Sequence, residues 1–174
     1  MTIIDTRVLE HRALVAFLRE HVQESMAFYV EYDFRKVLIV SAASFIEKRI
    51  VDTLHAFASK AADQRIEHVL RNTVFKREKF SSLFEWSGNN VNAFLKQFGE
   101  DFKKLLAESI SNDLQLSNGA KSFLKLGHLR NNLVHNNFAD SSSDQTVEDV
   151  YAEYNSAMCF VEFLCQRFDE TVAS

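Results

Sequence analysis

The sequence predicts an all-α bundle with a long central helix pair plus short helices, because turn-forming residues are scarce and apolar residues recur with helical spacing. The 174 residues include no proline and four glycines, whereas average usage would give about nine prolines. Barrels, sandwiches and many-turned α/β sheets place Gly and Pro in their tight connections. A chain of this length buries roughly 70% of its unfolded surface. We therefore expect a single domain over 1–174 that needs no disulfide or metal.

Apolar residues spaced three and four apart place the helices along the chain. In chain order, the segments expected to be helical are about 8–26, 34–59, 63–86 (one broken or two short helices), 91–98, 100–110, 120–134 and 146–168. The breaks expected between the later helices are 87–90, Gly99, Ser117-Asn118-Gly119 and the serine-rich loop 140–144. Ser117-Asn118-Gly119 is also expected to cap the following helix.

The composition also indicates where the protein acts. No stretch approaches 18 uninterrupted apolar residues, so we expect no membrane-spanning helix. The first ten residues are charged and lack the apolar core of a signal peptide. Cys159 and Cys165 lie six apart in a helical pattern, which favours two reduced packing residues over a disulfide. A cytoplasmic location is expected.

The net charge of −4 is unevenly distributed. Residues 1–113 sum to zero, and residues 140–174 carry eight carboxylates against one arginine, a charge of −7. Residues 114–139 contain no carboxylate, and Lys121, Lys125 and Arg130 give them +3. A short basic segment in a mildly acidic protein indicates local anion binding, not a general affinity for nucleic acid.

The same segment holds a chemically suggestive run, Gly-His-Leu-Arg-Asn-Asn-Leu-Val-His-Asn-Asn-Phe over 127–138. Arg130 offers a planar fork that suits bidentate contact with phosphate oxygens. His135 can take and give a proton near neutral pH. Metal-free RNA cleavage needs a base, an acid and a cation that stabilises the charged transition state. Four asparagines accompany the pair: Asn131, Asn132, Asn136 and Asn137.

The spacing of Arg130 and His135 limits how they could cooperate. Five residues along an ideal helix turn by about 500°, so the two side chains lie about 140° apart. Either the helix ends before His135 and the loop brings it round, or the second partner comes from another subunit. A two-fold dimer would place two of each side chain in one cleft.

Arg130-Asn131 followed by three residues and His135, before the last long helix, resembles the R-x4-H signature of the HEPN superfamily. The stretch 80–91, followed by 94–99, is similar to its RiboL-PSP and related MAE-type subgroup. Many members are dimeric, metal-independent RNases of toxin–antitoxin and phage-defence systems. The resemblance implies catalytic roles for Arg130 and His135, with Asn131 orienting the histidine or binding phosphate. Glu47 matches a polar residue often found on an earlier helix of this fold.

Each site residue also has a structural interpretation. Basic residues, His and Asn at a helix end can simply stabilise that end. Glu47 could be part of a structural ion pair, and His128 could be an ordinary surface histidine. The residues expected to bind substrate are Glu47, Asn132, Asn136, Lys125 and His128. No metal site is expected, because the histidines and cysteines form no ligand motif.

We therefore expect a metal-independent endoribonuclease without cofactors that leaves a 2′,3′-cyclic phosphate and a 5′-hydroxyl. The expected partners are RNA, a second copy in a homodimer, and an antitoxin or defence-system protein, with no membrane. Two alternatives stay open. One is a non-catalytic HEPN module that binds RNA, a nucleotide or a protein, and the other is a purely protein-binding helical subunit.

Overall fold

The computed structural model describes residues 1–61, 65, 70, 83–136, 138 and 144–170. These residues form helices and no β-strand, which confirms the all-α prediction. The helices are α1 (Ile3–Glu20), α2 (Glu24–Ala61), α5 (Asn92–Lys96), α6 (Glu100–Asn112), α7 (Leu114–His135) and α8 (Val147–Glu170). None of the helices in the described part of the chain combines the length and the apolar character that crossing a bilayer requires.

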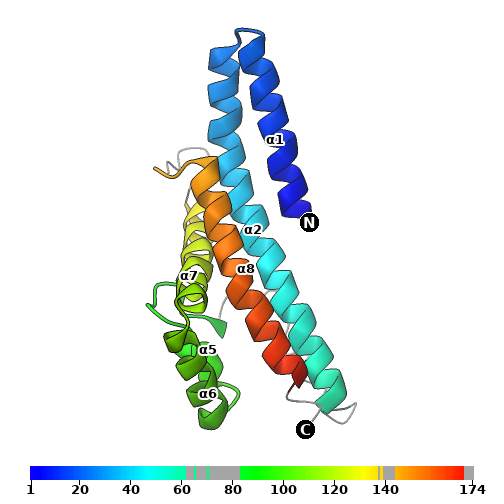
Figure 1. The fold of residues 1–174 in the computed structure, drawn as a ribbon, viewed down its shortest axis with the longest axis vertical. Helices are drawn as coiled ribbons and strands as arrows, with labels where there is room; N and C mark the ends of the chain where they lie inside the picture. The colour runs from blue at the N-terminus through cyan, green and yellow to red at the C-terminus, as the bar shows by residue number, and fades with distance from the viewer. Residues whose placement is uncertain (62–64, 66–69, 71–82, 137, 139–143, 171–174) are drawn as a thin grey trace.

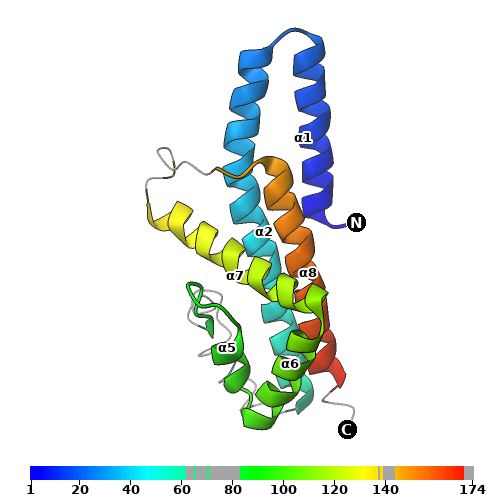
Figure 2. The same ribbon diagram turned by 60° about the vertical axis from the view of Figure 1, so that its left-hand side comes forward.

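The long helix α2 is the spine of the molecule (Figure 1). Its 38 residues span about 57 Å at 1.5 Å per residue. The first half of α2 and α1 lie side by side as an antiparallel hairpin, and the second half packs against α8 (Figure 1). The short helices α5 and α6 lie beside the beginning of α7 (Figure 2).

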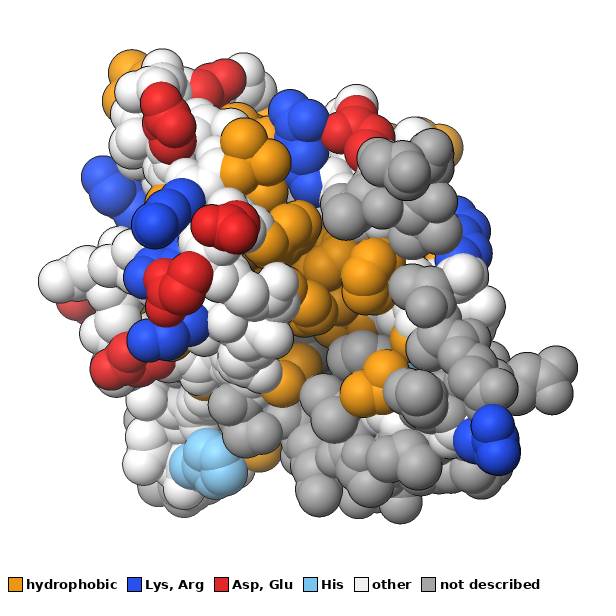
Figure 3. All heavy atoms as spheres, turned by 90° about the horizontal axis from the view of Figure 1, so that it is seen from below, with side chains coloured by type: hydrophobic (Ala, Val, Ile, Leu, Met, Phe, Trp, Pro, Cys, Tyr) orange, Lys and Arg blue, Asp and Glu red, His pale blue; other side chains and the backbone are white. Residues whose placement is uncertain are grey.

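The core lies where α8 packs along both α2 and α7. Gly119 of α7 permits a close approach, because a Cβ there would lie 2.7 Å from the carbonyl oxygen of Ser156 in α8. At the lower end of the molecule, the Phe168 ring contacts the rings of Phe57, Phe98 and Phe102, with centroids 4.7–5.3 Å apart. Apolar side chains gather in the centre of this end (Figure 3).

The helix starts show where local sequence signals hold. Thr146 and Asp149 cap α8 reciprocally: the Asp149 backbone N–H donates to the Thr146 hydroxyl, and the Asp149 carboxylate accepts from the Thr146 backbone. The predicted start of the last helix near Thr146 is therefore confirmed. Thr2 and Asp5 form the same capping box on α1.

Two predicted breaks are wrong. The second helix begins at Glu24 and not at residue 34, because the chain already reverses at Val22, whose φ of 56° is left-handed without a glycine. The break at Ser117-Asn118-Gly119 lies inside α7, which begins at Leu114 and is capped by the Asp113 carboxylate. Gly119 serves helix packing there instead of a turn. Most of the helical segment predicted over 63–86 lies outside the described residues.

Candidate functional site

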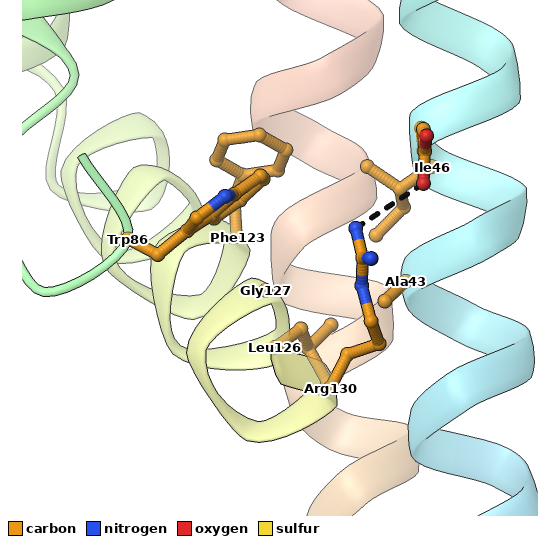
Figure 4. Close-up of a pocket in the computed structure, with 8 residues that line it drawn as sticks. Ala43, Ile46, Trp86, Phe123, Leu126, Gly127 and Arg130 are labelled. Carbon is orange, nitrogen blue, oxygen red and sulfur yellow. Dashed lines mark hydrogen bonds and ion pairs between the residues drawn. The ribbon is translucent and has the colours of Figure 1, made fainter. Parts of the chain in front are cut away.

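Arg130 of α7 and Glu47 of α2 form an ion pair at the interface between the two helices (Figure 4). Nη2 of Arg130 donates to Oε2 of Glu47 over 3.2 Å, and the two side chains are 18% and 8% exposed. Burying a carboxylate is costly unless a charge or hydrogen bond compensates it, and Arg130 supplies both. Nε of Arg130 is buried and has no hydrogen-bond partner among the described residues. The guanidinium therefore has donor capacity that its observed contacts do not use.

A small hollow adjoins this ion pair (Figure 4). It is lined by Ala43, Ile46, Glu47, Trp86, Phe123, Leu126, Gly127 and Arg130, and its volume is about 10 Å³. The Trp86 ring closes it by packing on Gly127, where a Cβ would overlap the ring. Room for about one water remains. The hollow therefore cannot hold a nucleotide, and a phosphate would have to approach Arg130 from its exposed side.

His135 is the last residue of α7 and is exposed. The helical hydrogen bond from the Asn136 backbone to the Asn132 carbonyl closes the final turn behind it. The possibility that the helix ends before His135, so that a loop brings it round, is therefore wrong. His135 stays about 140° around α7 from Arg130 and about 7.5 Å further along it. One chain does not bring the guanidinium and the imidazole together.

The outward face of α7 gathers most of the other predicted site residues. Lys121, Lys125, His128, Asn132 and His135 follow one another at intervals of four, three, four and three residues, and all five are exposed. This spacing places them on one side of a helix. We call these five residues the α7 stripe.

Among the described residues, side chains of the α7 stripe make two polar contacts. Lys125 forms an ion pair with Glu153 of α8, and the Asn132 amide donates to Nε2 of His128 over 3.0 Å. Asn131 is half-buried beside the stripe, and Asn136 is the exposed cap residue of α7. Most of the predicted residues thus fall into two groups, an inward pair, Glu47 and Arg130, and an outward stripe that ends at His135, while Asn131 and Asn136 belong to neither.

A family model described as RiboL-PSP-HEPN matches residues 10–174. The chain belongs to the RiboL-PSP-HEPN family. The predicted superfamily and subgroup are therefore confirmed, and the match covers all but the first nine residues of the chain. No curated protein and no solved structure matches the chain.

The sequence did not single out two cations of α2, Lys36 and Arg35, that contact the chain near the motif. Lys36 of α2 is 2% exposed. Its Nζ donates to the Phe138 carbonyl over 3.1 Å and lies 4.4 Å from the centroid of the Tyr32 ring. Arg35 donates to the Gln145 carbonyl over 2.8 Å. The two side chains thus tie α2 to the chain on both sides of residues 139–143, shortly after His135. The available signal in the sequence was the pair of adjacent cations, Arg35 and Lys36, directly before the apolar run 37–40 of α2.

The described part of the HEPN domain contains no group of three or more His, Cys, Asp or Glu side chains that could hold a metal ion. The groups available for chemistry there are the guanidinium of Arg130, the carboxylate of Glu47, the imidazole of His135 and the neighbouring amides. Such a set can bind an anion and move protons.

Proposed function

We propose that the protein is a metal-independent endoribonuclease that acts as a homodimer. The observation that carries this proposal is the placement of two groups on α7. Glu47 of α2 holds the partly exposed Arg130, and the exposed imidazole of His135 lies at the end of the same helix as Arg130. The cation and the proton carrier are those that metal-free phosphodiester cleavage needs.

The reaction is a transesterification within the RNA backbone. One imidazole takes the proton of a 2′-hydroxyl, and the 2′-oxygen forms a bond to the adjacent phosphorus. The bond from phosphorus to the 5′-oxygen breaks, and an imidazolium gives that oxygen a proton. Arg130 stabilises the negative charge on the phosphoryl oxygens, and Glu47 fixes the guanidinium. The products are a 2′,3′-cyclic phosphate and a 5′-hydroxyl.

Two copies of the chain supply the base and the acid. A single His135 cannot accept one proton and donate another in the same instant, and it lies away from Arg130 of its own chain. A two-fold axis near the carboxyl ends of α7 would bring the two histidines and two arginines to one phosphate. The end of α7 diverges from α2 and α8 (Figure 2). It exposes Val134 by 57% and, just beyond the helix, Phe138 by 43%, apolar surface that a second copy would cover.

An RNase of this kind would act in the cytoplasm as a toxin or phage-defence effector. Uncontrolled cleavage of cellular RNA stops growth, so an antitoxin or defence-system protein would have to restrain it. Growth arrest on expression of the wild type, but not of His135→Ala, would support this role.

The cleavage assay compares wild type and His135→Ala on total RNA in the presence of EDTA, with the product ends mapped. Removing a general acid–base group costs about 10²–10⁴-fold in rate, so cleavage by His135→Ala should fall by at least about 100-fold with an unchanged helical circular dichroism signal. The matched control is His21→Ala, since His21 is an exposed histidine that follows α1. If purified His135→Ala cuts RNA at the wild-type rate, the proposal is wrong.

A second candidate function is a HEPN module that binds RNA without cutting it. It is favoured by the contact of Arg130 with Glu47 and by a hollow with room for about one water. RNA binding by the wild type without EDTA-resistant cleavage would support this alternative over the nuclease.

A further inference from the structure

The first three residues of the α7 stripe, Lys121, Lys125 and His128, border an open groove. One hollow of about 530 Å³ lies between the stripe and the chain before α5, where Lys121, Lys125 and His128 face Trp86 and Asn89. A second hollow of about 510 Å³ shares Asn89 and Lys121 with the first, so the two adjoin. Each has the volume of a typical small-molecule site and exceeds what one nucleotide needs.

The groove is basic on the α7 side. The whole of α7 contains no carboxylate, and Lys121 and Lys125 are exposed along it. Carboxylates of neighbouring elements lie close by: Glu108 of α6 lines the second hollow, and Glu153 of α8 pairs with Lys125. Lysine ammonium groups at one helix face suit the phosphates of a nucleic acid backbone.

The opposite side of the groove suits bases. Asn89, Asn90 and Asn92 line the second hollow with amides, which can both donate to and accept from base edges. The Trp86 ring is half-buried and is held against Gly127 and Phe123. A fixed aromatic ring beside cations is the arrangement on which single-stranded bases stack.

We infer that this groove binds single-stranded RNA and guides it along the α7 stripe to His135. The inference rests on the proposed nuclease function and names the form of its substrate. Fourteen residues separate Lys121 from His135, about 21 Å along the helix axis, so the track holds several nucleotides on one side of the scissile phosphate. Amides and a ring reach unpaired bases, whereas a duplex keeps its base edges in its grooves.

The test measures binding separately from cleavage. The probe is an oligouridine of about twelve nucleotides with 2′-O-methyl groups, which blocks the attacking hydroxyl. Fluorescence anisotropy of the labelled probe reports binding. Trp86 is the single tryptophan of the chain, so its emission reports occupancy of the groove in the same titration. Binding should quench the Trp86 emission, and the midpoint of the quenching curve should equal the midpoint of the anisotropy curve.

The variant that tests the track is Lys121→Gln/Lys125→Gln, and the matched control is Lys48→Gln, an exposed lysine of α2 that pairs with Asp52. The slope of log K against log salt is negative, and two fewer phosphate contacts on a single strand make it shallower by about 1.4. Raising salt fourfold should therefore weaken binding by the wild type about sevenfold more than binding by the double variant. Lys48→Gln should behave as wild type.

Glu153→Gln provides a second test, because it frees Lys125 and removes a negative charge beside the track. It should shift the binding midpoint to lower protein concentration. If the double variant keeps the wild-type midpoint, salt slope and Trp86 quenching, the track is wrong. A 2′-O-methyl duplex that binds as tightly as the single strand, with equal quenching, would overturn the single-strand assignment.

The failure of the track and the failure of the nuclease are distinguishable. Loss of cleavage in His135→Ala with an unchanged double variant would leave the nuclease standing and remove the track. Specific binding of the probe with no cleavage of unmodified RNA by wild type would support the track and remove the nuclease.

Discussion

Arg130 and Glu47 bring opposite charges into the contact between α7 and α2. Such a pair links the two helices and also fixes the direction of the guanidinium. Removal of one member leaves the other as a buried charge without compensation, which is more costly than replacing both by apolar groups. The stability of a double replacement therefore reports the structural role of the pair, and its cleavage of RNA reports the catalytic role.

Glu47→Gln should lower the free energy of unfolding by about 1–3 kcal/mol, less than the loss for a fully buried pair because Arg130 is partly exposed. The apolar double variant Glu47→Leu/Arg130→Met should recover most of that stability but should not cleave RNA, because it lacks the guanidinium. Urea denaturation and the cleavage assay measure the two effects. Lys48→Gln breaks an exposed pair and should change stability by less than about 0.5 kcal/mol. Full cleavage by the double variant would show that the pair is structural alone.

The residue types of the site could be predicted, but their contacts could not. Arg130 and His135 stand out because a guanidinium and an imidazole suit phosphodiester chemistry, and Glu47 stands out as a carboxylate among apolar neighbours. The direct contact of Glu47 with Arg130, 83 positions away, depends on the pairing of α2 with α7. Helical spacing indicates which residues share a face, and tertiary packing decides which face is inward.

At the scale of elements, α1 rests on α2 through a buried histidine. His11 is 7% exposed and stacks on Phe34 with ring centroids 4.0 Å apart. Burial lowers the pKa of His11, although the carboxylates of Glu31 and Glu148 act in the opposite direction and Arg12 adds to the lowering. The neutral imidazole is therefore the form that the folded protein favours.

This pKa shift makes stability depend on pH. The unfolded chain protonates His11 near pH 6.5, whereas the folded chain resists protonation, so unfolding takes up a proton as the pH falls. The contribution of His11 is complete above about pH 6.5 and declines below it. The melting temperature of wild type should fall more between pH 7.5 and 5.5 than that of His11→Phe. His21→Phe, which alters an exposed histidine, should follow wild type. Parallel curves for wild type and His11→Phe would contradict the assignment.

The helix boundaries show why local signals were partly misleading. Ser117-Asn118-Gly119 has the composition of a turn, yet α7 passes through it because the lack of a side chain at Gly119 lets α7 approach α8. The cap that begins α7 is Asp113, four residues earlier than the expected signal. Thr146 with Asp149 gave a correct start because both halves of its capping box are local. Local chemistry identifies a cap but does not tell a packing glycine from a turn glycine.

At the scale of the whole molecule, the proposed site needs two copies of the chain. The all-α class could be predicted, because the lack of proline and the apolar spacing are properties of the entire sequence. The orientation of Arg130 toward the bundle and of His135 away from it could not be predicted, since it depends on how α7 lies against α2. That orientation separates Arg130 from His135 of the same chain, which is the reason the proposed site includes a second copy.

Mixing wild type with an inactive variant tests whether the site forms between chains. His135→Ala should be inactive, and its mixed dimer with wild type contains a single intact His135, which cannot act as base and acid at once. After partial unfolding and refolding with an excess of His135→Ala, cleavage per wild-type chain should fall in proportion to the fraction of wild-type chains, and light scattering should give the mass of a dimer. Wild type refolded alone is the control. Cleavage per wild-type chain that does not change with the excess of His135→Ala, with a dimer mass, would show that each chain holds a complete site.

The division of α7 into an inward and an outward side also bears on how this protein can diversify. Inward positions such as Gly127 and Leu133 are constrained by neighbouring side chains, whereas Lys121, His128 and Asn132 are exposed, and exchanges at such surface positions typically alter stability by less than about 0.5 kcal/mol. Under the proposed function, selection can therefore change how strongly the outward side holds an RNA backbone without endangering the architecture. Natural variants with altered RNA affinity should differ along the α7 stripe and share the same interior.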